Sequence, residues 1–239
     1  MRKFLLLLLL LPLAGMSQTK NVISTFRIFP KVDKSIEFEK GFIAHAKKYH
    51  TGDWKWKVFE IQSGPDFGGY QVNEGPLAWD SFDKRGNLGA EHTADWATNV
   101  MPFTADRGSA TYVEFNEELS SVQLNDIADK ILIMHIYPKP GMIINLEAMI
   151  KKMKAAWIEG KESVAVWKAV ASGEPQYLTI SRLKQGLKEL DSDFRDPTSE
   201  RYDIVHGADA WKNYLKDYSN TVEKRWSELL FFRPDLSSQ

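Results

Sequence analysis

His135 lies in the apolar run ILIMHIY (131–137), the setting that most favours a chemical role among the five histidines. An imidazole can ligate a metal or haem iron, or transfer a proton. A lone histidine in a strand is more often a hydrogen-bonded core residue, so both interpretations stand. Tyr137 follows two residues later, and Arg27 begins the similar stretch RIFPKV (27–32), 108 residues before His135. In both stretches a polar side chain lies close to an aromatic one at the same position of the strand. This repetition indicates the wall of a ligand pocket.

The same pocket is expected to receive side chains from the second strand of each half. The candidate ligand-binding residues are Arg27, Trp56, Glu60, His135, Tyr137 and Trp167. Phe26 and Ile28 correspond to Met134 and Ile136 and are apolar in both halves, so they are expected to face the helices. On this assignment Phe59 and Ile61 face the helices as well. In the functional interpretation, aromatic walls and a few charges orient a small molecule. In the structural interpretation, Arg27 and Glu60 pair with each other beside a hydrogen-bonded His135, because buried charges are normally paired.

A second group with metal-binding chemistry lies in EHTADW (91–96). His92 and Asp95 are three residues apart, so they share one side of a helix, and imidazole with carboxylate can ligate a divalent metal. Such pairs are common on solvated helix faces, and the sequence identifies no third ligand, so we expect no metal site. Of the other histidines, one is expected to pack in the core (His45) and two to be solvated at element ends (His50 and His206).

The strong enzyme signatures are absent from the sequence: G-x-S-x-G, H-E-x-x-H, the P-loop and G-x-G-x-x-G. We therefore assign no catalytic residue, which favours a binding protein over an enzyme. The chain has no cysteine, which excludes disulfides and thiolate metal sites. Its 31 basic and 32 acidic residues leave a near-neutral charge. Nucleic-acid binding draws its affinity from positive charge, so no nucleic-acid partner is expected.

The elements that position these residues follow the order β-α-β-β-α-β twice. Alternating residues predict strands, and apolar stripes at helical spacing predict helices. The first half has predicted strands at 25–29, 54–62, 70–74 and 111–115, with helices at 35–50 and 90–100. The second half has predicted strands at 130–137, 163–171, 176–182 and 228–233, with helices at 142–158 and 208–226.

Collinear matches between the halves indicate duplication. Phe29-Pro30-Lys31 matches Tyr137-Pro138-Lys139 at an offset of 108, Ser63-Gly64 matches Ser172-Gly173 at 109, and Gly89-Ala90 matches Gly207-Ala208 at 118. The drift corresponds to an insertion of about nine residues, which the loop 191–206 would carry, because insertions belong in surface loops. The alternative is two unlike domains with chance matches.

This element order resembles the dimeric α/β-barrel superfamily, fused into one chain. A βαββαβ unit with an open antiparallel sheet is ferredoxin-like. The resemblance implies an α+β fold of two tandem ferredoxin-like units whose sheets pack together as an internal pseudo-dimer. The superfamily includes antibiotic-biosynthesis-type monooxygenases, EthD-like and NIPSNAP-like proteins, and haem-binding or haem-degrading members. No residue motif of one such family is present, so the cofactor stays open, with haem as one option.

The first residues, MRKFLLLLLLLPLAGMS (1–17), have the charged start, apolar run and small residues of a secretory signal peptide. We expect cleavage after Ser17 and export to the periplasm or outside a bacterial cell. Met16 stands where a lipidated cysteine would be required, so no lipid anchor is expected. The remaining chain divides into a first unit at 22–121 and a second unit at 129–239.

The sequence predicts an exported protein that binds a small apolar or aromatic molecule between its two sheets. One alternative is a haem-linked or cofactor-independent monooxygenase-type enzyme with His135 as ligand or base. Another is a non-catalytic envelope protein that binds a partner or a glycan. Because the two units are tethered by a short linker, we expect a monomer. No membrane anchor is expected.

Overall fold

The structure is a computed structural model that describes residues 19–171 and 173–238. The expected signal peptide and its cleavage site lie outside the described residues. Within the described ranges, no helix combines the length and the apolar character that a bilayer crossing requires.

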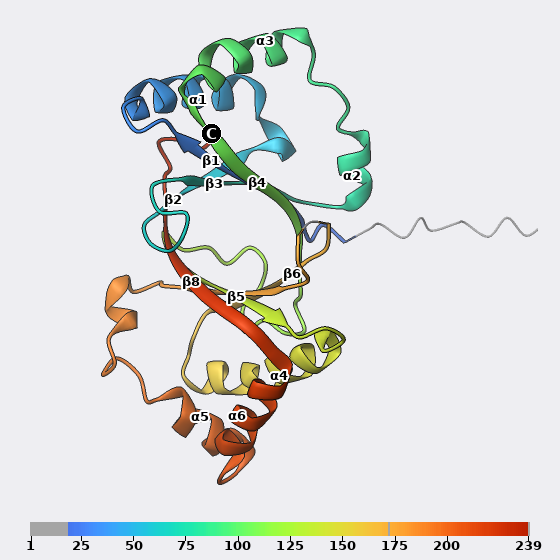
Figure 1. Ribbon diagram of the computed structural model, residues 1–239. Helices are drawn as coiled ribbons and strands as arrows, with labels where there is room; N and C mark the ends of the chain where they lie inside the picture. Colours follow the sequence, from blue (N-terminus) through green and yellow to red (C-terminus); the bar gives the residue numbers. More distant parts are fainter. Residues whose placement is uncertain (1–18, 172, 239) are drawn as a thin grey trace, which may run out of the picture.

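The described strands form one closed antiparallel barrel (Figure 1). Their order around the barrel is β1-β3-β2-β8-β5-β7-β6-β4. The strands are β1 (Val22–Pro30), β2 (Trp56–Ile61), β3 (Tyr70–Leu77), β4 (Thr104–Phe115), β5 (Lys130–Pro138), β6 (Val164–Ala169), β7 (Tyr177–Arg182) and β8 (Val222–Phe232). This architecture confirms the α+β class and the antiparallel sheet.

Helices cover the outside of the barrel at two opposite ends of the molecule (Figure 1). They are α1 (Ser35–Tyr49), α2 (Trp79–Lys84), α3 (Ala90–Asn99), α4 (Ile143–Glu159), α5 (Thr198–His206) and α6 (Ala210–Thr221). Three short 3-10 turns complete the elements: η1 (Gly52–Trp54), η2 (Met101–Phe103) and η3 (Leu187–Leu190). Helices α1 and α3 lie over the first half, and α4, α5 and α6 lie over the second.

The two halves have the same strand order. It is β4-β1-β3-β2 in the first half and β8-β5-β7-β6 in the second. The halves meet where β2 pairs with β8 and where β4 pairs with β6. We expected two separate sheets packed face to face. The edges of the two sheets instead hydrogen-bond to each other, which removes the unpaired strand edges that an open sheet would expose.

Two predicted elements differ from the structure near the end of the chain. The predicted helix 208–226 ends at Thr221, and β8 begins at Val222, six residues before the predicted strand. Two β-branched residues at this point favour a strand, and the helical spacing of Trp211, Leu215, Tyr218 and Val222 concealed the change. The predicted insertion loop 191–206 contains α5, which buries Tyr202 in the core of the second half.

Each half has an apolar core between its helices and the outer face of the barrel. In the first half, Phe38 and Phe42 of α1 pack on Ile28 of β1. In the second half, Leu146 and Ile150 of α4 pack with Ile136 of β5. Alternate residues of each strand point to opposite faces. The residues that alternate with Ile28 in β1 and with Ile136 in β5 therefore point into the barrel.

Candidate functional site

The barrel encloses a cavity of about 560 Å³. One part of its wall is apolar and includes Ile23, Phe59, Val113, Ile131, Ile133, Trp167, Leu178 and Ile180. Another part is polar and includes Arg27, Asp66, Gln71, Asn73, His135 and Gln176, with the ring of Trp226 beside them. An apolar chamber with a few convergent polar groups is the usual form of a small-molecule site.

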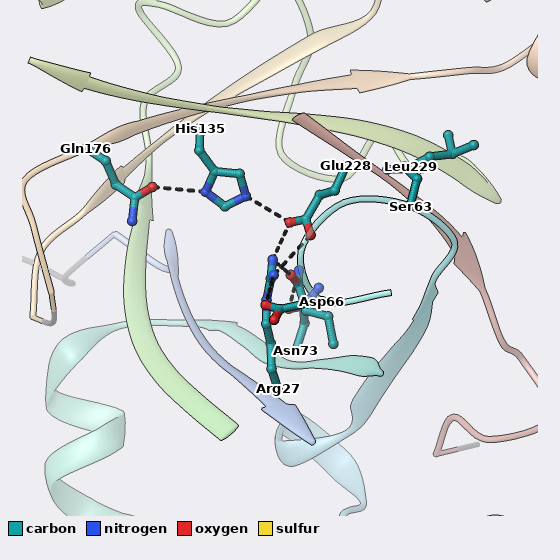
Figure 2. A network of polar contacts seen from close by, with 9 residues as sticks. Arg27, Ser63, Asp66, Asn73, His135, Gln176, Glu228 and Leu229 are labelled. Carbon is teal, nitrogen blue, oxygen red and sulfur yellow. Dashed lines mark hydrogen bonds and ion pairs between the residues drawn. The ribbon is translucent and has the colours of Figure 1, made fainter. Parts of the chain in front are cut away.

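Glu228 is the centre of the polar network behind this part of the wall (Figure 2). Its side chain is fully buried, and it points into the barrel because it pairs with the inward-facing Ile133 of β5. Arg27 binds both carboxylate oxygens through its two terminal nitrogens, with Nη1 3.0 Å from Oε2. His135 lies on the other side, with Nε2 2.8 Å from Oε1. One carboxylate from the second half thus joins Arg27 of the first half to His135 of the second.

Arg27 has further acceptors besides Glu228. Its Nη1 donates to Asp66 Oδ2 at 2.6 Å and its Nη2 to Gln71 Oε1 at 3.1 Å. Burial acts to lower the pKa of Arg27, but the hydrogen bonds and charges of Glu228 and Asp66 outweigh it and hold the pKa above its usual value. The guanidinium is therefore permanently charged and internally paired, as a buried charge must be.

A tight turn after β2 carries Asp66 to this network. The Leu229 amide donates to Ser63 Oγ at 2.9 Å, which fixes the turn against β8. Gly64 has a φ of +91°, and a Cβ there would lie 3.0 Å from the Cβ of Glu228. Glycine is required on both counts, because it tolerates positive φ and leaves room for the neighbouring strand.

His135 is fixed on three sides. Gln176 Oε1 lies 3.0 Å from Nδ1, Glu228 accepts from Nε2, and the Trp226 ring stacks on the imidazole with centroids 3.7 Å apart and planes 7° apart. An axial haem ligand needs a free ring nitrogen facing the iron. Both nitrogens of His135 are engaged, so its surroundings do not fit the haem ligation that the sequence left open.

Thr25 supplies a polar group that the protein itself does not satisfy. Its Oγ1 is shielded from solvent and has no hydrogen-bond partner among the described residues, and the residue lines the cavity. A buried hydroxyl without a partner costs about 1–3 kcal/mol. A molecule in the cavity that hydrogen-bonds to Thr25 would recover that cost.

Four of the six predicted pocket residues line the cavity: Arg27, His135, Tyr137 and Trp167. The expected positions of the other two are wrong. Trp56 lies in the apolar core beneath α1, and Glu60 pairs with Arg233 at 3.0 Å. Trp56 and Glu60 thus lie outside the cavity, whereas the ligand-binding role of the four cavity residues stays a prediction.

The error in β2 is a slip of one residue. The predicted turns Ser63-Gly64 and Ser172-Gly173 are 109 residues apart, and the same offset applied to the strands aligns Val58 with Trp167. Val58, however, packs in the helix-side core. Phe59, at an offset of 108, is the residue that faces the cavity. Because side chains alternate along a strand, a slip of one residue reverses the face of every side chain. The expectation that Phe59 faces the helices is wrong for the same reason.

Sequence reasoning missed Glu228, Asp66, Gln71, Gln176 and Trp226. The alternation of RWSELLFF (225–232) would have placed Trp226 and Glu228 on one face. It could not indicate which face points inward. The predicted Arg27–Glu60 pair is also wrong, since Arg27 pairs with Glu228 and Asp66.

The histidines outside the barrel also depart from expectation. His45 is buried, as expected, and His206 is exposed. His50 is only 1% exposed, so its expected solvated position is wrong. His50 follows the last residue of α1, where the chain turns inward, and its imidazole stacks on the ring of Trp56.

No protein-family model and no curated protein matches the sequence. Solved structures do match the fold. A "putative monooxygenase" from Lactobacillus acidophilus NCFM is 10% identical with a TM-score of 0.52, covering 92% of this chain and 96% of that one. The fold is that of a dimeric α/β-barrel. An anthrone oxidase-like protein matches this barrel at 15% identity with a TM-score of 0.54, covering 90% and 92% of the two chains.

A mutant chlorite dismutase from Candidatus Nitrospira defluvii is a third neighbour of the barrel. It is 10% identical with a TM-score of 0.50, covering 91% of this chain and 93% of that one. Identities this low show a shared fold alone. The chemistry of this dimeric α/β-barrel has to be argued from its own side chains.

Proposed function

We propose that the protein binds a small, largely apolar or aromatic molecule inside its barrel. The observation that carries this proposal is the cavity of about 560 Å³, with an apolar wall facing one polar network. A cavity of this size is within the range of ligand pockets.

The charges of the network define the ligand further. Arg27 already has three acceptors, Glu228, Asp66 and Gln71. An anionic ligand would have to displace one of them and would meet two carboxylates. A neutral molecule with hydroxyl or carbonyl groups fits better, because Thr25 and the amides of Gln176 and Asn73 can hydrogen-bond to it without disturbing the ion pairs. Phenols and quinones have this character.

Binding is tested by thermal shift and tryptophan fluorescence with a panel of phenols, quinones and haem. Trp167 and Trp226 line the cavity, so we expect an aromatic ligand to quench their emission and raise the melting temperature. Ile180→Phe would project a larger side chain into the cavity and weaken binding about tenfold, since the ligand would lose part of its space. Ile36→Phe is the matched control, because Ile36 is 82% exposed on α1. No shift with any compound would contradict the proposal.

A second candidate is a monooxygenase-type reaction on the same class of ligand. Two of the matched structures, those named as a putative monooxygenase and as anthrone oxidase-like, support it. Within this chain, the His135–Glu228 pair supports it, because Glu228 accepts from Nε2 and Nδ1 would accept a proton from a phenol that displaces Gln176. Dioxygen would be the oxidant and the phenolic substrate the reductant: one oxygen atom would enter the ring to give a quinone, and the other would leave as water with the two hydrogen atoms that the phenol loses.

Oxygen uptake separates the two candidates. A ligand that stabilises the protein would be incubated with it in air, and the product would be analysed by mass spectrometry for added oxygen. A reaction requires uptake that is lost in His135→Gln while ligand binding persists. Binding without uptake favours the non-catalytic function.

The proposal also covers the duplication of the chain, its oligomeric state and its export. The equal strand orders of the halves support a duplicated ferredoxin-like unit, spanning 22–121 and 129–239. Closure of the barrel within one chain supports a monomer, which light scattering can test. The sequence 1–17 supports export, which N-terminal sequencing of the mature protein can test through the expected cut after Ser17.

A further inference from the structure

Three histidines converge outside the barrel, between the helices of the first half. His45 lies on α1, His50 follows the end of α1, and His92 lies on α3, which packs against α1. His45 Nε2 is 3.2 Å from His92 Nε2 and 3.4 Å from His50 Nε2. One nitrogen of each ring lies within 4.8 Å of the other two. We call His45, His50 and His92 the histidine cluster.

These separations are those of a metal site. Zn²⁺ binds imidazole at about 2.0–2.1 Å with tetrahedral angles, which places two ligating nitrogens about 3.3 Å apart. The nitrogen pairs of His45 with His92 and with His50 already have this spacing. His92 is partly exposed on a surface helix, so its ring has the freedom to close the remaining distance.

Carboxylates lie behind two of the rings. Asp95 Oδ2 is 2.8 Å from His45 Nδ1, and Glu74 Oε2 is 3.4 Å from His50 Nδ1. Glu74 is itself held by Trp56 Nε1 at 3.1 Å and by Arg85 at 2.7 Å. A histidine that directs its Nδ1 proton at a carboxylate presents the lone pair of Nε2, which is the usual second shell of a histidine metal ligand.

The buried side of the cluster has an unsatisfied polar atom. His50 Nδ1 is shielded from solvent and makes no hydrogen bond among the described residues, although Glu74 Oε2 lies 3.4 Å from it. Because His45 Nδ1 faces Asp95, the lone pair of His45 Nε2 points towards the other two rings. Both His45 and His50 are only 1% exposed, so water has little access to these nitrogens.

Aromatic rings fix the cluster in place. The His50 ring stacks on Trp56 with centroids 3.5 Å apart, and His45 packs against Trp96 at 5.0 Å. Burial lowers the pKa of all three histidines, to about 4 for His50. The imidazoles are therefore neutral, the form that ligates metal.

We propose that His45, His50 and His92 bind one divalent transition-metal ion of the Zn²⁺ class, with Asp95 and Glu74 as the outer shell that orients two of the ligands. Neutral imidazoles suit Zn²⁺, Co²⁺, Ni²⁺ and Cu²⁺, whereas Mg²⁺ and Ca²⁺ prefer oxygen ligands. Three protein ligands leave a fourth tetrahedral position for water or another small ligand. The site is separate from the barrel cavity and does not depend on the function proposed for it.

The test uses the untagged protein, stripped with EDTA and dialysed against Zn²⁺ or Co²⁺. We expect about one metal ion per chain and, with Co²⁺, the visible absorption bands of a tetrahedral nitrogen site. His92→Ala should weaken binding at least about 100-fold, since loss of a ligand costs more than loss of an outer partner. Asp95→Asn should weaken it about 10–100-fold. Both residues are partly exposed, so neither change opens a buried cavity.

His206→Ala is the matched control, because His206 is an exposed histidine on α5, outside the cluster. It should bind metal as the unaltered protein does. Circular dichroism verifies that each variant is folded. The proposal is overturned if the folded, unaltered protein binds neither ion with one-to-one stoichiometry. It is also overturned if affinity and Co²⁺ spectrum are the same in folded His92→Ala and Asp95→Asn as in the unaltered protein.

Discussion

Helix α4 packs on the barrel through Leu146, Ile150 and Met153, whereas α1, at the same place on the other half, packs through Phe38, Phe42 and His45. Each pair of equivalent residues is 108 positions apart. The two helices thus cover the same kind of sheet, with an apolar residue in one half where the other half has a histidine.

The surroundings of these residues differ in the same way. Around Met153 the second half collects apolar and aromatic side chains, including Trp157, Tyr202 and Tyr214. Around His45 the first half collects two more histidines and the carboxylates of Asp95 and Glu74. At the position equivalent to His45, the second half packs its helix layer with an apolar side chain, although it buries Arg201 of α5 elsewhere in that layer. A histidine at this position is therefore not a requirement of packing, which is why the buried histidines of the first half point to a bound ion.

The barrel interior shows a second difference between the halves. Arg27 and His135 are equivalent, 108 positions apart, and both bind Glu228. In β4, the position equivalent to Glu228 of β8 is Thr111. Thr111 pairs with Thr25 of β1, and Glu228 pairs with Ile133 of β5, which lies 108 positions after Thr25. A single carboxylate, that of Glu228, thus serves both halves.

The largest effect is expected from Glu228→Ala. The change removes a fully buried acceptor and leaves Arg27 with one carboxylate and His135 with none. Breaking a buried ion pair by removing one partner costs about 3–5 kcal/mol. Denaturant unfolding should show this loss. Thr111→Ala, at the equivalent position, should cost less than about 1 kcal/mol. Equal losses for the two variants would contradict the asymmetry of the interior.

The second prediction concerns the pH dependence of the first half, measured in EDTA. Burial lowers the folded pKa of His50 to about 4, against about 6.5 in the unfolded chain. Below pH 6.5 the unfolded chain binds more protons, so stability is complete above that pH and is lost as pH falls towards 4. The expected loss is on the order of 3 kcal/mol.

The groups facing the cluster modify this loss in both directions. Glu74 acts to raise the pKa of His50, and Arg85 and His45 act to lower it. Asp95 acts to raise the pKa of His45, and Lys48 acts to lower it. His50→Phe keeps a ring against Trp56 and removes the proton-binding group, so it should flatten the pH dependence between 6.5 and 4. An unchanged slope in this variant would assign the loss to other groups.

A reciprocal exchange tests the helix layers directly. Met153→His places an imidazole in an apolar core without a carboxylate partner, which should destabilise the protein by about 2 kcal/mol or more. His45→Met gives the first half the residue of the second, and metal-free stability should change by less than about 1.5 kcal/mol. Both values come from denaturant unfolding in EDTA. A large loss in His45→Met would mean that the histidine is needed for packing.

The sequence was informative about the faces of β1 and β5. Phe26, Ile28, Met134 and Ile136 were expected to face the helices, and all four pack in the helix-side cores. Comparing the two halves made this possible, because a face that is apolar in both copies is a core face. The same comparison failed in β2, where the turn and the strand have different offsets and one residue decides the face.

The polar partners could not be found from local pattern. Glu228 is 201 residues from Arg27 and 93 from His135, and no periodicity connects residues on different strands of a closed barrel. The histidine cluster is a similar case. His45 and His92 lie on different helices and are 47 residues apart in sequence. Only the packing of α1 on α3 brings His45 and His50 beside His92, the one ligand that the EHTADW motif supplies to the proposed site.

The smallest effect is expected from the surface ion pair that also links the halves. Lys151 of α4 contacts Glu118, in the loop after β4, and both side chains are more than 60% exposed. Exposed pairs lose in side-chain entropy and solvent screening most of what they gain in attraction. Glu118→Ala should therefore leave the unfolding midpoint unchanged within error, at low and at high salt. If the midpoint fell at low salt, surface charge would share in holding the halves together, and the strand pairings of β2 with β8 and of β4 with β6 would not suffice.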